Sequence, residues 1–304
     1  MAKSILSAPH FQDENAAFAY VEAHLWPQGP VCPFCGEKDR IGVLNGKTTR
    51  PGLRKCYACK KPFTVRIGTI FESSHLALRL WLQVIHLMCA SKKGISTRQI
   101  QRMLQCSMKT AWHLTHRIRH AMDPAVKGRL GGSGVTVEAD ETELGKSNKT
   151  RKRPEGRKGN AVVFSLVERG GTLRSIHLEG QTTPRLALLY NMDSRSRLVT
   201  DGAQHYQKIV PTHESVDHSK KEYVRGDVHT NTLEGFFSIF KRGLVGVYQQ
   251  MSKRHLHRYL AEFDFRMNNR EKLGVNDTMR AEIALQGVKG KRLTYKISHQ
   301  EMTA

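Results

Sequence analysis

Residues 32–35 read CPFC and residues 56–59 read CYAC, so two closely spaced cysteine pairs are separated by 20 residues. Four thiolates at this spacing are typical of a zinc ribbon. Chance is a poor explanation, because the whole chain contains only six cysteines. Four cysteine ligands leave no open position for water, so the ion is expected to hold the fold rather than to take part in chemistry. The sequence therefore predicts a structural Zn²⁺ with the ligands Cys32, Cys35, Cys56 and Cys59.

The charge of the chain predicts its partner. Its 304 residues include 49 Lys and Arg against 27 Asp and Glu, a formal net charge of +22. Basic residues recur in the ribbon and in residues 98–119, 146–158 and 241–270. For any one cluster, an ordinary solvated surface is the alternative. Together the clusters favour nucleic acid over a membrane, because no amphipathic helix with a large apolar face accompanies them.

The distribution of apolar residues indicates neither a membrane span nor export. The longest apolar stretch, residues 80–90, is interrupted by Gln83 and His86, so no transmembrane helix is predicted. The first residues lack an apolar region of signal-peptide length before Asp13. Reduced cysteines fit a cytoplasmic location, with nucleoid association in a prokaryote.

After a helix expected at residues 76–90, a helix-turn-helix is predicted. Ser96, with Gln99 three residues later, can cap a first helix, and Ser107 can cap a second. Ala111, Leu114 and Ile118 would face inward. The opposite face would then present side chains that can reach phosphates or base edges in a major groove, namely Lys109, Thr110, His113, His116 and Arg117. A plain helical hairpin with a solvated basic face is the alternative.

A glycine-rich linker in residues 124–134 separates this region from a predicted α/β domain. Strands are expected at residues 135–140, 161–168, 172–179 and 197–201, with a helix near 184–191. Between the first two strands, residues 145–160 contain seven basic residues and one acid. This segment is predicted to be a basic loop, in which Arg151, Lys152 and Arg153 are candidate DNA contacts.

Two aspartates end predicted strands of this domain. Asp140 ends the first strand and Asp201 ends the fourth, so both carboxylates can lie at neighbouring strand ends. Carboxylate oxygens suit Mg²⁺ or Mn²⁺, and two such ions about 3.5–4 Å apart can activate a nucleophile and stabilise a leaving oxygen in phosphoryl transfer. A third ligand must come from another segment.

The segment HTNTLEGFFSIFKRGLVG, residues 229–246, offers that ligand. An apolar stripe at helical spacing runs through Leu233, Phe236, Phe237, Phe240 and Leu244. Glu234 and Lys241 lie two turns apart at the edge of this stripe, where one can face a metal ion and the other DNA phosphate. Asn231, one turn earlier, can also reach the ion. Taken alone, each acid is more often a plain surface carboxylate.

From CPFC through the HTN-x-x-E segment to HLHRYLAEFDFRMNNR, about residues 13–270, the chain resembles zinc-ribbon insertion-sequence transposases with a DDE-type, ISXO2-like integrase domain. The resemblance implies a ribonuclease-H-like α/β catalytic domain, divalent-metal-dependent strand cleavage and transfer, double-stranded DNA as partner at terminal repeats and target, and a homo-oligomer on DNA. Carried over by position, the catalytic residues are Asp140, Asp201 and Lys241. Of Glu234 and Asn231, we favour Glu234 as third ligand, because its spacing to Lys241 gives one continuous face.

The expected organisation is a helix and zinc ribbon in residues 1–70, a helix-turn-helix region in 71–125, the catalytic domain in 135–285 and a basic tail in 286–304. Two other functions remain open at this point. A decayed transposase would bind DNA without consuming it, although all candidate ligands are present here. A metal-dependent nuclease or resolvase would cut DNA without joining it.

Overall fold

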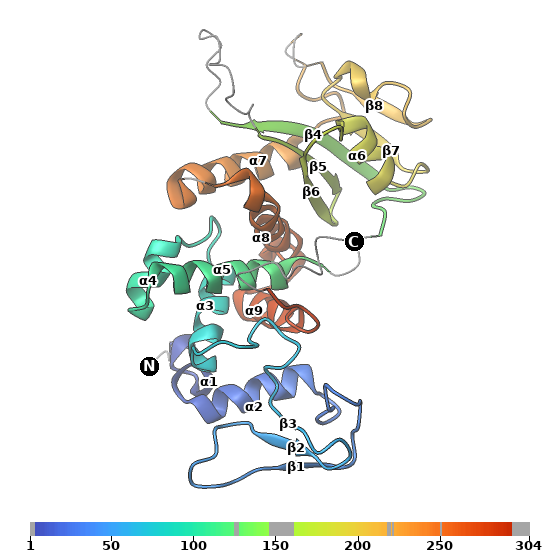
Figure 1. Ribbon diagram of the computed structural model, residues 1–304. Coiled ribbons are helices and arrows are strands. Elements are labelled where there is room, and N and C mark those ends of the chain that lie inside the picture. The colour runs from blue at the N-terminus through green and yellow to red at the C-terminus, as the bar shows by residue number, and fades with distance from the viewer. Residues whose placement is uncertain are drawn as a thin grey trace. The chain divides into compact units, whose positions relative to one another are not determined.

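A computed structural model describes residues 4–124, 128–145, 161–217, 220, 222–249 and 251–293. Within these residues the chain divides into two compact units (Figure 1). The first unit contains the described residues up to Pro124 and again from Val275 onward. The second contains those between Ala125 and Gly274.

The first unit begins with short helices and a small antiparallel sheet. The helices are η1 (Ile5–Ser7), α1 (Pro9–Gln12) and α2 (Glu14–Leu25), and the strands are β1 (Ile41–Val43), β2 (Arg54–Cys56) and β3 (Pro62–Phe63), in the order β1-β2-β3. Asp13 caps α2 by accepting a hydrogen bond from the Ala16 N–H at 2.8 Å. One face of α2 is apolar and buried, through Phe18, Val21 and Leu25.

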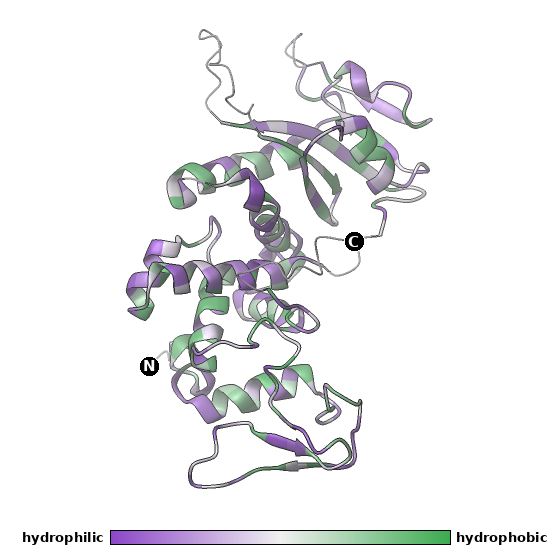
Figure 2. Ribbon diagram, viewed as in Figure 1, coloured by the Kyte–Doolittle hydropathy of each residue, from purple (hydrophilic) through white to green (hydrophobic). Residues whose placement is uncertain are grey.

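Three further helices follow the ribbon: α3 (Leu78–Ala90), α4 (Thr97–Leu104) and α5 (Met108–Met122). The predicted caps are confirmed, since the Ser96 hydroxyl accepts from the Gln99 N–H and the Ser107 hydroxyl from the Thr110 N–H. Figure 2 shows the contrast between the two parts of this unit, with a hydrophilic β2 and a largely hydrophobic α3. No helix in the described part of the chain is long and apolar enough to cross a membrane.

The helix α9 (Asp277–Gln286) joins this first unit, whereas the sequence placed residues up to 285 in the catalytic domain. It packs against α3, and the Arg280 side chain donates a 2.8 Å hydrogen bond to the Cys89 carbonyl near the end of that helix. The first described residues of the expected tail also pack here, because Lys291 donates to the Ala121 carbonyl at 3.0 Å. The remainder of the tail, residues 294–304, lies outside the described residues.

The second unit is built on a five-stranded sheet in the order β6-β5-β4-β7-β8. Its strands are β4 (Thr136–Leu144), β5 (Ala161–Glu168), β6 (Leu173–Leu178), β7 (Arg197–Thr200) and β8 (His213–Ser215). The pairs β4–β5 and β5–β6 are antiparallel, whereas β4–β7 and β7–β8 are parallel. A mixed α/β fold is thereby established, and the four strands expected from sequence alternation are present. The expectation that Asp140 ends its strand was wrong, because β4 continues to Leu144 and pairs with β5 along that extension.

Helices cover both faces of this sheet. On one face α6 (Pro184–Asn191) packs with Val137 and Ala139 of β4, and η2 (Gln204–Tyr206) follows β7. On the other face, an aromatic core joins β5 to α7 (Asn231–Gly243) and α8 (Leu256–Asn268). Successive side chains of a strand point to opposite faces, so Glu138 and Asp140 lie on the α7 side. The turns η4 (Leu244–Tyr248), η5 (Lys253–His255) and η6 (Glu271–Leu273) complete this unit.

Candidate functional site

Parallel pairing of β4 with β7 brings the two predicted aspartates to corresponding positions. The register of this pair aligns Glu138 with Val199. Two residues further along each strand are Asp140 and Asp201. Asp140 is held locally, because its Oδ1 accepts from the Glu141 N–H at 2.7 Å, and Asp201 Oδ1 accepts from the Ala203 N–H at 3.2 Å. The central strands therefore deliver both carboxylates to one region of the sheet.

The pKa of Asp140 indicates that other acids lie near it. Burial, followed by the negative charge of Asp201, raises the pKa of Asp140 to about 7, with Glu141 and Glu234 adding to the effect. Glu234 comes from α7, more than thirty residues after Asp201 in the chain. A pKa raised in this way is typical of a site that favours a bound cation, because a cation offsets the burial and the repulsion of the ionised carboxylate.

Helix α7 carries the remaining predicted residues, and all three are exposed. Its stripe is buried as expected at Leu233, Phe236, Phe237 and Phe240. Glu234 accepts a 3.5 Å hydrogen bond from the Thr230 hydroxyl. Asn231 is the first residue of the helix, and Lys241 lies in its last turn. Of the two candidate third ligands, Glu234 is the one that contributes to the raised pKa of Asp140.

The carboxylate oxygens are more widely spaced than the cysteine sulfurs. In the described part of the chain, the four cysteines form the group whose ligand atoms all lie within 4.8 Å of one another, and the three acids do not meet that limit. Three hard oxygen donors remain the ligand type that Mg²⁺ and Mn²⁺ prefer. The donor set thus fits a divalent cation.

Two side chains beside the acids were not identified from sequence. Tyr206 is fully buried and donates its hydroxyl to Glu141. Its pKa is raised by burial, then by the charge and the hydrogen bond of Glu141, with further contributions from Asp140 and Asp201. His205 Nε2 lies 3.3 Å from Glu141 Oε1. Glu141 points to the opposite face of β4 from Asp140. Its position directly after Asp140 was the sequence signal that could have drawn attention to Glu141 and its two partners.

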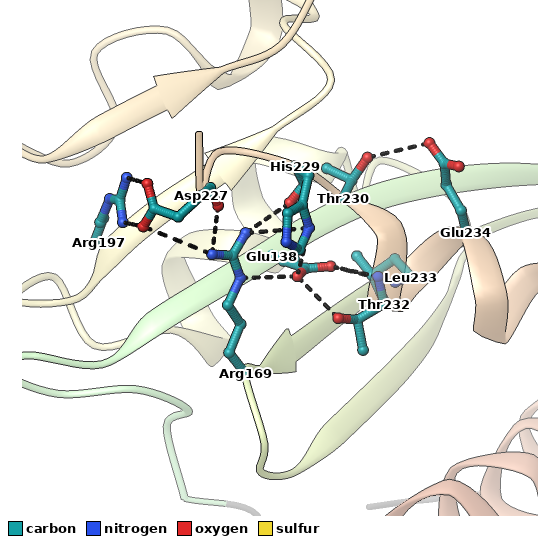
Figure 3. Close-up of polar contacts among 9 residues, drawn as sticks. All are labelled: Glu138, Arg169, Arg197, Asp227, His229, Thr230, Thr232, Leu233 and Glu234. Atoms are coloured by element: carbon teal, nitrogen blue, oxygen red, sulfur yellow. Dashed lines mark hydrogen bonds and ion pairs between the residues drawn. The ribbon is translucent and has the colours of Figure 1, made fainter. Parts of the chain in front are cut away.

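The acid Glu138 was also not identified from the sequence, and its side chain is completely buried. It binds Arg169 and the first turn of α7, as Figure 3 shows. Glu138 lies in the polar register of the alternating strand VTVEAD, with Thr136 and Asp140, so the sequence pattern alone carried no signal of its burial.

The ribbon cysteines converge as predicted. The sulfurs of Cys32 and Cys59 lie 3.7 Å apart, and those of Cys35 and Cys56 lie 3.6 Å apart. Burial opposes ionisation of Cys32, but N–H groups of the following turn point at its sulfur and lower its pKa to about 7. The N–H of Glu37 acts on Cys35 in the same direction, but desolvation and hydrogen bonds with the neighbouring thiols raise the pKa of Cys35 to about 12. The fit to Zn²⁺ therefore rests on the four converging sulfurs.

The predicted DNA contacts of α5 are placed less uniformly. Lys109 is exposed, and Thr110 and His113 are half-buried. The prediction was wrong for His116 and Arg117, because both side chains are buried. Arg117 donates to the carbonyls of Glu72 and Leu293 at 2.8 and 3.1 Å, since these segments cover the face that was taken to be open. Arg151, Lys152 and Arg153 lie outside the described residues.

Comparison with known proteins finds matches for both the zinc ribbon and the α/β unit. Residues 129–268 match the model of the ISXO2-like transposase domain, and residues 12–62 match that of a transposase zinc-ribbon domain. The chain is also 30% identical over 277 residues to an uncharacterized protein in transposable element ISH50 of Halobacterium salinarum. That alignment covers 84% of this chain and 91% of the relative.

Proposed function

Because this chain belongs to the zinc-ribbon, ISXO2-like family of insertion-sequence transposases, we propose that it is an active DDE-type enzyme that cleaves and transfers DNA strands. The observation that carries the proposal is the pairing of β4 with β7, which aligns Asp140 with Asp201 beside the acid of α7. The strand order, three antiparallel strands followed by two parallel ones, supports a ribonuclease-H-like domain.

Asp140, Asp201 and Glu234 are the residues that would hold Mg²⁺ or Mn²⁺. When bound, the divalent cation activates the attacking oxygen and stabilises the leaving oxygen of the phosphodiester. Asn231 would orient the first turn of α7 rather than serve as the third ligand. Lys241, two turns beyond Glu234 on an exposed face, would bind a phosphate of the DNA end.

DNA binding is assigned to the first unit and to the basic loop of the second. The zinc ribbon, with α4 and α5 as a helix-turn-helix, would recognise terminal repeats through Lys109, Thr110 and His113. Arg151, Lys152 and Arg153 would contact DNA beside β4. The net charge of +22 supports binding along an extended polyanion. We further propose a homo-oligomer on DNA, acting in the cytoplasm on the nucleoid.

The test is incubation of the full-length protein with DNA that carries the terminal repeats flanking its own gene, with Mg²⁺ and without it. The wild type should cleave and join these ends only with the ion. Asp140→Asn should bind the DNA and leave it intact, because a neutral amide is a poor Mg²⁺ ligand. Glu143→Gln, which alters an exposed acid of the same strand, is the matched control and should retain activity.

Each alternative predicts a different product. Cleavage without joining would make the protein a nuclease. Specific DNA binding with no cleavage by the wild type would make it a non-catalytic DNA-binding protein. Cleavage that survives in Asp140→Asn would overturn the assignment of the site.

A further inference from the structure

Glu138 is a buried carboxylate that the proposed chemistry does not use. It lies on β4 two residues before Asp140, on the same face of the sheet, and its side chain has 0% exposure. Burying a charge in this way is costly unless the charge is paired and hydrogen-bonded. The partners of Glu138 therefore indicate which part of the structure its buried charge stabilises.

The first set of partners is the amino terminus of α7. The capping residue of this helix, Thr230, provides no side-chain cap. Glu138 supplies one from a neighbouring strand, because its Oε2 accepts from the Thr232 N–H at 3.0 Å and the Leu233 N–H at 3.3 Å. The Thr232 hydroxyl adds a 2.9 Å bond to Oε1. These N–H groups have no partner within the helix, and a negative charge there is favoured by the helix dipole.

The second partner is Arg169, which follows β5. Its Nε donates to Glu138 Oε1 at 3.0 Å. Its other nitrogens donate to the carbonyls of Asp227 and His229, at 2.6 and 2.9 Å, in the segment that leads into α7. Figure 3 shows that Arg169 lies between this segment and Glu138. The pair therefore fixes both the helix end and the chain that enters it.

This network joins two of the proposed ligands by a short path. Glu138 and Asp140 are separated by one residue of β4, and Leu233 is followed directly by Glu234 in the first turn of α7. The core of α7 sets how deeply the helix packs on the sheet, whereas the contacts of Glu138 set where its first turn lies along β4.

We propose that Glu138 and Arg169 are positioning residues, which hold Glu234 at the distance from Asp140 that a divalent cation requires. The inference rests on the proposed function, because it concerns the affinity of the same carboxylate site. Groups that orient ligands in this way typically change metal affinity by about 10–100-fold when they are altered.

The experiment measures Mn²⁺ affinity by calorimetry, thermal unfolding, and hydrogen exchange at the amides of Thr232 and Leu233, in the zinc-loaded full-length protein. Glu138→Gln keeps the side-chain length but loses the charge, and it should weaken Mn²⁺ binding about 10–100-fold with faster exchange at both amides. Thr232→Val removes a single hydroxyl bond and should weaken binding about 2–10-fold while the protein remains folded.

Glu262→Gln is the matched control. Glu262 is equally buried in the same unit, accepts a 2.6 Å bond from Tyr248 and pairs with Arg266, on a helix that packs against β6. Its loss should lower the melting temperature without changing Mn²⁺ affinity. A purely structural role for Glu138 would give the same pattern as this control.

The outcomes separate the two proposals. If the wild type binds no Mn²⁺, or if Asp140→Asn binds as tightly as the wild type, the proposed site itself is wrong. If binding depends on Asp140 but Glu138→Gln and Thr232→Val retain wild-type affinity, the positioning role is overturned. Should Glu138→Gln not fold, the affinity of Thr232→Val alone decides.

Discussion

The zinc ribbon and the proposed carboxylate site both gather residue types that bind metal ions, but they are built in different ways. The four ribbon sulfurs come from two turns in residues 32–35 and 56–59, and they lie within 4.8 Å of one another. The three acids come from β4, from the end of β7 and from α7, and they are held by sheet register and helix packing. Local turns bring the four sulfurs close together, whereas the spacing of the three carboxylates depends on how distant elements pack.

Loss of one ribbon ligand is expected to have the largest effect on stability. Cys56→Ser should release zinc and unfold residues 32–65, because zinc contributes about 10–16 kcal/mol to folding in small zinc modules. Zinc analysis and thermal unfolding measure the effect. Cys106→Ser, which alters a cysteine outside the ribbon, should keep both zinc and stability.

A fragment tests whether the two regions are independent. Residues 125–274 should fold without zinc, since they make up the whole second unit. An intact protein that holds no zinc, or a fragment that unfolds when zinc is removed, would contradict the comparison.

The next largest effect concerns the third ligand. Glu234→Gln should reduce single-turnover cleavage of bound terminal DNA by about 1,000-fold, since it removes a charge from the cation site. Asn231→Ala should cost about 2–10-fold, the value of one lost hydrogen bond. Full activity in Glu234→Gln together with loss in Asn231→Ala would make the asparagine the ligand.

Substitution of Asp140 by Asn should raise the stability of the protein although it abolishes activity. Its pKa is raised to about 7 in the folded protein, so the folded state holds a proton that the unfolded state has lost. Stability therefore falls as pH rises from about 4 to about 7. Asp140→Asn, which cannot ionise, should be more stable than the wild type by about 2–4 kcal/mol above pH 7, and equally stable below pH 4.

Thermal unfolding of both proteins across this pH range, in zinc-loaded samples, provides the measurement. Added Mg²⁺ should stabilise the wild type and leave Asp140→Asn unchanged. A wild type that is as stable as the variant at pH 8 without Mg²⁺ would show that neither burial nor the neighbouring acids destabilise the ionised Asp140.

The smallest effect is expected at Lys241. Lys241→Ala should weaken binding of DNA ends and reduce the slope of log affinity against log salt by about one phosphate contact. Cleavage of DNA that is already bound should be partly retained. Lys272→Ala, another exposed lysine of the second unit, is the control, and an equal change of slope in both variants would remove the special role of Lys241.

Local patterns predicted much of this molecule from its sequence. Alternation located the strands around Asp140 and Asp201, and cysteine spacing located the ribbon. The burial of Arg117 was missed because helical periodicity does not say which segments cover a face, and here the chain near Leu293 returns to it. For the same reason α9 was assigned to the catalytic domain, although it packs against α3.

Long-range contacts explain what the sequence could not provide about the site. Glu138 is one of several acids in the VEADETE segment, and its separate role depends on Arg169 and on the first turn of α7. The sequence placed Asp140 and Asp201 at strand ends, but the register that aligns them follows from the parallel pairing of β4 with β7.

The most direct test of the central claim is to locate Mn²⁺ by its anomalous scattering in crystals of the full-length protein grown with terminal-repeat DNA. The account predicts Mn²⁺ bound by oxygens of Asp140, Asp201 and Glu234, at about 2.0–2.3 Å, with Zn²⁺ confined to the four ribbon cysteines. Mn²⁺ bound away from Asp140 and Asp201, or with Asn231 in place of Glu234, would contradict it.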